Sequence, residues 1–199
     1  MKSTTLILLA TVAVAGLAAG CSAKDHGQAA AESTTSTTIT TTSWSKSTPG
    51  SAVPELDLSN FAYSPCDLLK ADQLSQLGTF KAPEVDDSPL GPGCRWKSQK
   101  VTEGPTYAVT LSPQGNTLES MMENARSEPV FKETTVLGYR AFSSDQTNGK
   151  GTCSTTVGTS SEDAVVVHAT TLNESSPEYG DTCAASEKFA TLVVTTLKG

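Results

Sequence analysis

After residue 21 the sequence lacks any apolar run that could cross a membrane, since a spanning helix needs roughly 20 consecutive apolar residues. It also lacks a block of Lys or Arg. The chain has 14 basic and 21 acidic residues, and its net charge at pH 7 is −7. Nucleic-acid-binding domains gather positive charge into a patch or stripe. The composition therefore argues against a nucleic-acid partner and against a membrane helix beyond residue 21.

Residues that carry common chemistries are also scarce. There are two histidines, His26 and His168. The sequence contains no Cys-x-x-Cys, and no His is close to any of the four cysteines other than Cys21, so no zinc site is expected. No phosphate loop, dinucleotide loop, calcium loop or nucleophile elbow appears. We therefore predict no cofactor, no metal and no catalytic residue, and we expect that the protein is not an enzyme.

The first segment has the pattern of a lipoprotein signal. Residues 6–19 are apolar and uncharged, too short for a membrane-spanning helix but suited to a signal peptide. Small residues then precede Cys21, although Ala18 stands where a Leu is usual. We expect residues 1–21 to be a lipoprotein signal peptide with its lipobox cysteine, and the thiol of Cys21 to carry a diacylglycerol. The protein would then be lipid-anchored on the extracytoplasmic face of the cell membrane; a secreted protein cut after Ala31 is the alternative.

A polar segment separates this signal from the rest of the chain. Ser or Thr fills nearly every position from Ser33 to Thr48. Such a stretch has too little apolar area to offset the entropy lost on ordering. We expect residues 22–59 to be a disordered Ser/Thr-rich tether and residues 60–199 to be a single globular domain. Composition alone leaves open whether the tether carries O-linked sugars.

The patterns after residue 60 predict an α+β domain. We expect an antiparallel sheet of about five strands with helices packed on one face. A short or broken helix is predicted over 65–77, and later helices begin after Asn116 and Asp181. Alternation predicts strands over 80–85, 94–97, 106–112, 152–158 and 164–171, whereas 130–136 is ambiguous and 137–142 bends into a short strand.

Four cysteines lie in this domain: Cys66, Cys94, Cys153 and Cys183. An even number in an exported chain implies two disulfides and an oxidising compartment. Four cysteines allow three pairings.

An ordered set of short motifs resembles a known family. The motifs are Pro65-Cys66-x-Leu68-Leu69, Leu74-x-x-Leu77-Gly78, Gly93-Cys94-x-Trp96, Leu137-Gly138-x-x-Ala141, and Cys153 with Cys183 ahead of the final helix. No single motif is specific, but together they are similar to the actinobacterial lipoprotein family of domain of unknown function 3558. The resemblance covers residues 60–199 and includes the lipobox and tether. It implies an exported, membrane-anchored domain with a Mog1/PsbP-like antiparallel sheet and flanking helices, and it implies no catalytic residues.

We predict the sequential disulfide pairing, Cys66–Cys94 and Cys153–Cys183. In this pairing each bond ties the start of one helix to one strand.

One face of the sheet is left over if the helices cover the face that carries Trp96 and the strand valines. Strand alternation places on this candidate ligand face Arg95, Lys97, Thr110, Ser154, Thr156 and His168. These side chains are polar, mildly basic and rich in hydroxyls, which suits an anionic or sugar-like envelope component. The alternative is a face that is simply solvated, as in many antiparallel sheets.

These observations favour a membrane-anchored, non-enzymatic binding or accessory module of the cell envelope. Its partner would be the membrane, through the lipid anchor, and an unknown envelope component or protein. The alternatives are a hydrolase of envelope polymers and a structural interaction subunit of a membrane complex. A clustered acid, base or nucleophile in a cleft would favour the hydrolase, and an exposed apolar patch without a pocket would favour the interaction subunit.

Overall fold

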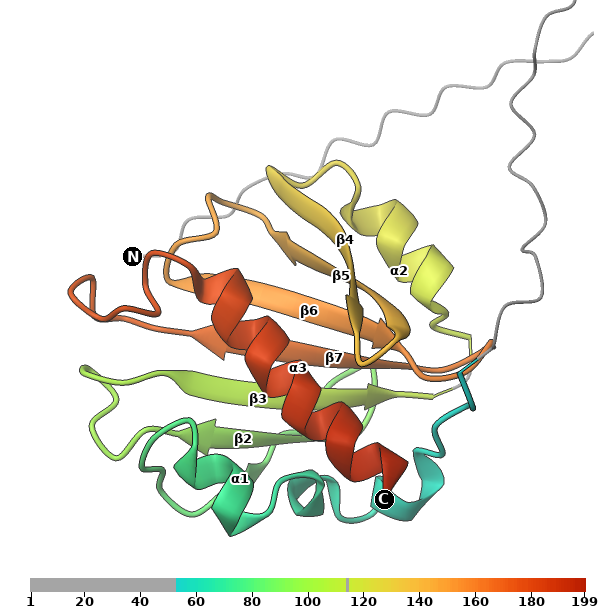
Figure 1. The fold of residues 1–199 in the computed structure, drawn as a ribbon, viewed down its shortest axis with the longest axis horizontal. Coiled ribbons are helices and arrows are strands. Elements are labelled where there is room, and N and C mark those ends of the chain that lie inside the picture. The colour runs from blue at the N-terminus through green and yellow to red at the C-terminus, as the bar shows by residue number, and fades with distance from the viewer. Residues whose placement is uncertain (1–52, 114) are drawn as a thin grey trace, which may run out of the picture. The chain divides into compact units, whose positions relative to one another are not determined.

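The computed structural model describes residues 53–113 and 115–199, so Cys21, the predicted signal peptide and most of the predicted tether lie outside the described residues. Seven strands form one antiparallel sheet in the order β1-β2-β3-β7-β6-β5-β4 (Figure 1). They are β1 (Glu84–Val85), β2 (Gly93–Lys97), β3 (Thr106–Ser112), β4 (Val130–Val136), β5 (Tyr139–Asp145), β6 (Thr152–Gly158) and β7 (Ala164–Thr170). The predicted α+β class is confirmed, but the sheet has seven strands rather than about five.

The ambiguous stretch accounts for much of this difference. It forms a full hairpin, in which β4 pairs with β5 from Val130↔Asp145 to Val136↔Tyr139. β4 is the edge strand of the sheet, and both Lys132 and Glu133 in its centre are exposed. An edge strand with adjacent exposed positions lacks the alternation that identifies a half-buried strand, so its sequence pattern is weak.

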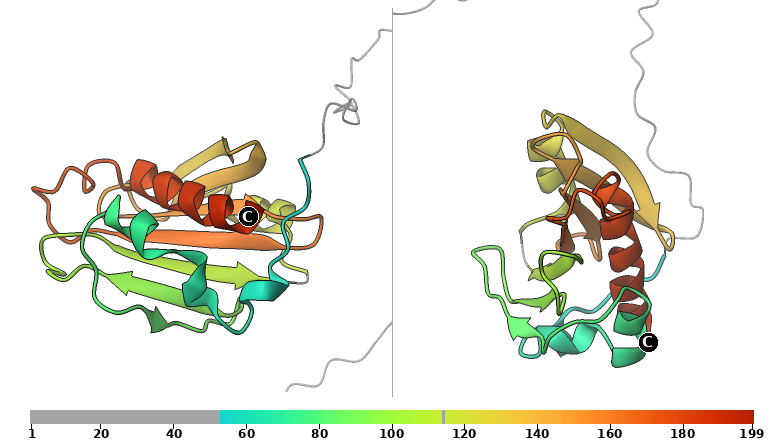
Figure 2. Two further views of the ribbon diagram at one scale, coloured as in Figure 1. Left: turned by 60° about the horizontal axis from the view of Figure 1, so that its bottom comes forward. Right: turned by 90° about the vertical axis from the view of Figure 1, so that its left-hand side faces the viewer.

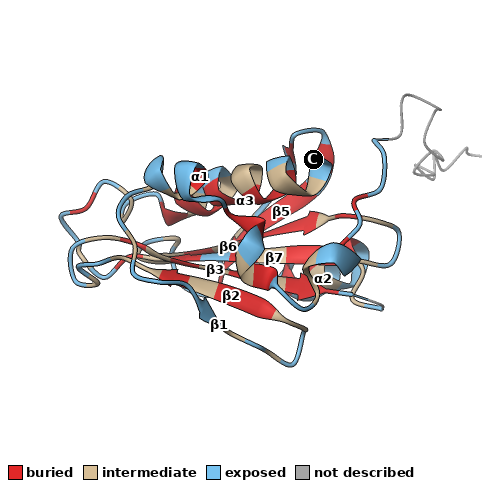
Figure 3. Cartoon of the chain, turned by 90° about the horizontal axis from the view of Figure 1, so that it is seen from below, coloured by how far each residue is buried: buried red, intermediate tan, exposed pale blue. Residues whose placement is uncertain are grey.

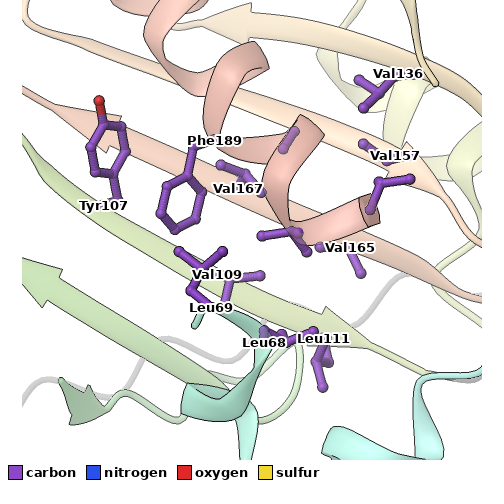
Figure 4. Close-up of a cluster of buried hydrophobic side chains, with 14 of the residues drawn as sticks. Leu68, Leu69, Tyr107, Val109, Leu111, Val136, Val157, Val165, Val167 and Phe189 are labelled. Atoms are coloured by element: carbon purple, nitrogen blue, oxygen red, sulfur yellow. The ribbon is translucent and has the colours of Figure 1, made fainter. Parts of the chain in front are cut away.

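Helix α3 (Thr182–Lys198) covers one face of the sheet, which we call the inner face (Figures 1 and 2). The inner-face side chains Trp96, Tyr107, Val109, Leu111, Val157, Val165 and Val167 are all buried, as the alternation predicts. Phe189 of α3 points into this layer (Figure 4), where its ring stacks on Tyr107 with centroids 4.6 Å apart and tilts against Trp96 at 5.5 Å. Leu68 and Leu69 close the core near β2 and β3.

The prediction that the helices pack on one face is wrong, because α2 (Leu118–Ala125) packs on the opposite, outer face. Leu118, Met122 and Ala125 form a separate cluster with Phe142 of β5. Phe142 neighbours Ala141, which belongs to the inner core, and successive strand residues point to opposite faces.

Three short helical segments lie at the start of the domain, and a capping side chain precedes each of the two longer helices, α2 and α3. The predicted broken helix is present as a 3₁₀ turn, Pro65–Leu68, and helix α1 (Ala71–Ser75), after a first 3₁₀ turn at Ser59–Phe61. The predicted cap of α3 is confirmed, since Asp181 Oδ1 accepts a hydrogen bond from the Ala184 amide at 3.1 Å. The cap of α2 is Thr117 rather than Asn116; its hydroxyl accepts from the Ser120 amide at 3.2 Å.

Residues 53–59, assigned to the tether by composition, lie on the domain. Leu56 and Leu58 are 5% and 6% exposed and join the inner core. The Leu56 amide donates to the Thr159 carbonyl at 2.8 Å, and the Tyr139 hydroxyl donates to the Pro54 carbonyl at 2.7 Å. The packed chain therefore begins before residue 60.

Both predicted disulfides are present. Cys66–Cys94 joins the 3₁₀ turn Pro65–Leu68 to β2, and Cys153–Cys183 joins β6 to the first turn of α3. Buried residues run along the central strands, whereas β1 at one edge is exposed (Figure 3). No helix within residues 53–113 and 115–199 is long and apolar enough to cross a membrane.

Candidate functional site

The outer face of the sheet carries the predicted ligand residues. One row crosses four neighbouring strands, because Arg95 of β2 is opposite Ala108, Ala108 is opposite His168 of β7, and His168 is opposite Ser154 of β6. Side chains of directly opposed residues share a face. The alternation argument therefore placed Arg95, His168 and Ser154 on the correct side.

The basic side chains of this face are both engaged by acidic neighbours. Arg95 donates to Asp86 Oδ2 through Nε at 3.0 Å and Nη2 at 2.5 Å. Lys97 Nζ lies 2.6 Å from Glu84 Oε2, and this hydrogen bond and the attraction of Lys97 hold the pKa of the Glu84 carboxyl below its usual range. Consequently the face is much less basic than its sequence suggests, and its fit to an anionic ligand is weaker.

Helix α2 removes part of the predicted face from solvent. Thr156 is 4% exposed and lies opposite Phe142, which belongs to the α2 cluster. Thr110 of β3 is half-buried. It lies in the same row as Thr156, because both residues are opposite Val166 of β7, which runs between their strands. Thr156 is therefore part of the packing under α2, and the accessible part of the face is its other end.

At that end, Ser154 and His168 are in direct contact. The Ser154 hydroxyl lies 2.6 Å from Nδ1 of His168, and the Thr152 hydroxyl lies 3.3 Å from Nε2 of the same ring. Both ring nitrogens are thus held by hydroxyl groups. A serine nucleophile is usually activated by a His whose other nitrogen is oriented by a carboxylate, and here a threonine hydroxyl occupies that place.

These residues line a polar hollow of about 350 Å³, which we call the strand-end hollow. It lies where β5 ends and β6 begins, and Glu128, from the loop between α2 and β4, also lines it. Its lining residues are Glu128, Ser144, Asp145, Gln146, Thr147, Thr152, Ser154 and His168. Hydroxyl, amide, carboxylate and imidazole groups make up this lining.

Asp145 holds the loop at the edge of the hollow. Its carboxylate Oδ2 accepts hydrogen bonds from the Thr147 amide at 2.9 Å, the Thr147 hydroxyl at 2.6 Å and the Gly149 amide at 2.8 Å. Burial raises the pKa of the Asp145 carboxyl, but the hydrogen bonds from Thr147 and Gly149 outweigh burial and leave the pKa below its usual range. The carboxylate is therefore ionised at neutral pH and fixes the loop from β5 to β6.

His168 lies in the same electrostatic environment. Partial burial lowers the pKa of the His168 imidazole, because it disfavours the charged form of the ring. The negative charge of Asp145 raises this pKa, and the positive charge of Arg95 lowers it. The net shift is downward, although the residue keeps substantial contact with solvent. His168 is thus mainly neutral at pH 7 and can both donate and accept hydrogen bonds.

A second hollow, of about 400 Å³, lies at the opposite end of β5. It is lined by the start of the packed chain at Val53, the β4–β5 turn and the loop after β6. Of its three charged residues, Glu119 and Arg140 are paired with each other, and Glu55 accepts a hydrogen bond from the Ser161 amide at 3.4 Å. None of the predicted ligand residues lines it, so we regard the strand-end hollow as the better candidate site despite its smaller volume.

Within residues 53–113 and 115–199, no group of three or more His, Cys, Asp or Glu side chains is arranged to hold a metal ion. Sequence reasoning also missed most of the hollow. It ended the strand at Phe142, but continued alternation would have placed Ser144 on the outer face beside Ser154, with which it pairs. Asp145 just before Asn148-Gly149 is a further signal, because Asp side chains often accept hydrogen bonds from turn amides.

The sequence profile of one family, described as protein of unknown function (DUF3558), matches residues 16–196. The chain belongs to this family. No curated protein and no solved structure matches the chain. Membership in DUF3558 identifies the family that the ordered motifs resemble, and its description names no activity.

Proposed function

We propose that this DUF3558 protein is a lipid-anchored binding module on the extracytoplasmic face of the cell membrane. The observation that carries the proposal is the pairing of its cysteines. The chain has five cysteines, and four of them form two disulfides within the domain. Cys21 is the fifth cysteine, and it follows the small residues at the end of the signal-like run. Because the other four pair with one another, the Cys21 thiol has no disulfide partner within the chain and can carry the lipid that we propose.

The two disulfides support export. Structural disulfides form and persist in oxidising compartments outside the cytoplasm and are rare within it. A membrane-bound domain with such bonds would lie beyond the membrane, joined to Cys21 by the Ser/Thr-rich segment. Two acyl chains hold a protein to a bilayer far more stably than one, so a diacylglycerol suffices as an anchor. The Mog1/PsbP-like likeness and the actinobacterial origin implied by the resemblance remain predictions of the same kind.

The outer face supports a binding role. It offers rigid strands with hydroxyl and amide groups and a polar hollow, and rigid groups bind a ligand with little ordering cost. We propose that the partner is an envelope component and that it binds to this face. A purely structural subunit would instead present a contiguous exposed apolar patch.

The anchor is tested by expressing Cys21→Ser in the native host cells, with Ser22→Ala as the matched control. The Cys21→Ser protein should leave the membrane fraction or remain unprocessed, whereas the control should stay with the membrane. Intact mass of the wild-type protein should show an N-terminal cysteine bearing a diacylglycerol. A mature protein that begins after Ala31, or one without lipid, would contradict the proposal.

The contact between Ser154 and His168 is the one observation that favours a hydrolase. It is tested with a fluorophosphonate probe, which labels activated serines. We expect no labelling of the wild-type protein beyond that of Ser154→Ala, because the group that contacts the second nitrogen of His168 is the Thr152 hydroxyl and not a carboxylate. Labelling that depends on both Ser154 and His168 would contradict the proposed binding function and support the hydrolase instead.

A further inference from the structure

We propose that the strand-end hollow binds a neutral saccharide unit. This inference rests on the proposed binding function and names its ligand class. The hollow combines hydroxyl groups on two strands, a free amide and carboxylates around one opening. Sugar hydroxyls both donate and accept hydrogen bonds, so they match a lining that contains both donors and acceptors.

Two lining side chains are available to a ligand. Among the residues that the structure describes, none forms a hydrogen bond or ion pair with the side chains of Glu128 and Gln146, which both line the hollow. Glu128 accepts hydrogen bonds, and the Gln146 amide both donates and accepts them. Both groups can therefore form hydrogen bonds with the hydroxyls of a sugar in the hollow.

The remaining groups are held in place before a ligand arrives. Ser154 is fixed against His168, and Asp145 is fixed by Thr147 and Gly149. Ser154 and His168 also stand on central strands of the sheet. Because the positions of these groups do not need to be ordered on binding, a weakly interacting sugar can still be selected.

The charges of the hollow disfavour an anion. No Lys or Arg is among the lining residues, and the negative charge of Asp145 would repel a phosphate or carboxylate. The nearest basic residue in the same row, Arg95, is already paired with Asp86. An anionic ligand, one of the two classes that the sequence suggested, is therefore the poorer fit.

Apolar ligands and metal ions fit no better. The lining contains no Leu, Ile, Val, Met, Phe, Tyr or Trp side chain that could cover an acyl chain. Asp145 and His168 do not form a three-ligand group with Glu128 within the described residues. Of the four classes compared, namely anionic, apolar, metal-ion and neutral polyhydroxylated ligands, the last fits this lining best.

The test uses the full-length chain with its disulfides intact, solubilised in detergent. Glucose, galactose, mannose, N-acetylglucosamine and inorganic phosphate are titrated separately while backbone amide shifts are followed. We expect at least one sugar to shift the amides of Ser144–Gln146, Ser154 and His168 in a saturable manner, and phosphate to leave them unchanged. The double variant Gln146→Ala with Ser154→Ala should weaken that binding about tenfold.

The matched control is Gln99→Ala with Thr135→Ala, which changes the same kinds of group at exposed positions outside the hollow. Its affinity should stay within about twofold of wild type. Three outcomes would overturn the inference: no sugar shifts these amides, phosphate shifts them instead, or the control loses as much affinity as the double variant. Each leaves the lipid mass at Cys21 unaffected, so failure of the saccharide site is distinct from failure of the proposed anchor.

Discussion

Leu118 of α2 lies directly against Gly158 of β6. A Cβ atom on Gly158 would come within 3.2 Å of the Leu118 Cβ and 3.1 Å of its Cδ2. Glycine lets α2 approach the outer face this closely, and the helix then covers Thr156 and Phe142. The part of the outer face next to this contact is therefore covered by α2, and the hollow with Ser154 and His168 lies at the other end.

Replacing Gly158 with Val should destabilise the protein. The branched side chain would press on the Leu118 Cβ, which cannot move unless α2 shifts, and such overpacking costs about 1–3 kcal/mol. Urea unfolding measures the loss in the free energy of unfolding. The matched control is Gly180→Val, since a Cβ there meets nothing within 4 Å. Equal stabilities for the two variants would show that α2 is not held by this contact.

The comparison of sequence and structure turns on the same contact. Alternation located β3 and β6 with their observed ends and identified the large buried side chains that β2, β3, β6 and β7 place on the inner face, because one-sided burial imposes a period of two. It missed Val136 and Tyr139 of the β4–β5 hairpin. The apolar stripe of α2 indicated that the helix packs on something but not on which face. Gly158 within a strand was the available signal, since a strand glycine often marks a close approach.

The candidate site was harder to predict for a second reason. The neutralisation of Arg95 and Lys97 depends on Asp86 and Glu84, which reach them only because the two-residue strand β1 pairs with β2. So short a strand leaves almost no periodic signal. The sequence could therefore assign the basic residues to a face but could not show that their charges are already matched.

Leu137 should be replaceable by Asn with a gain in stability. Leu137 and Gly138 form the two-residue turn between β4 and β5, with φ values of +50° and +90°. A leucine in this left-handed region is strained by about 1–2 kcal/mol, whereas Asn tolerates it and Asn-Gly is a favoured hairpin turn. The Leu137 side chain is 44% exposed, so little packing would be lost.

We expect Leu137→Asn to increase the free energy of unfolding by about 0.5–1 kcal/mol. The matched control is Leu172→Asn, because Leu172 is also exposed but has no positive φ. This control should not gain stability. A loss of stability in Leu137→Asn would indicate that the leucine side chain makes a contact that outweighs the backbone strain.

Stability should fall on acidification, in part through His168. The folded-state pKa of His168 is lowered from its usual value of 6.5, so the unfolded chain takes up the proton more readily than the folded one. The contribution of this residue is therefore complete above pH 6.5 and decreases as the pH falls below that value. Asp145 acts in the same direction at lower pH, because its pKa is lowered from 3.8 and its stabilising effect is lost when it is protonated.

Urea midpoints at about pH 7 and about pH 5 measure this change around the usual pKa of histidine. His168→Gln should lose less stability than wild type between the two values. His26→Gln, at the other histidine of the chain, should behave as wild type. An unchanged pH dependence in His168→Gln would show that the shift at His168 makes no contribution.

The two disulfides should contribute almost equally, although they fasten different parts of the molecule. Cys66–Cys94 closes a separation of 28 residues and Cys153–Cys183 one of 30. In the chain-entropy model, loops of this length each stabilise the folded state by about 3–4 kcal/mol, because the cross-link restricts the unfolded chain. Paired Cys→Ser variants of either bond should therefore show similar losses in urea unfolding, with the remaining bond intact. A much larger loss for Cys153–Cys183 would mean that this bond acts mainly in the folded state, by holding α3 on β6.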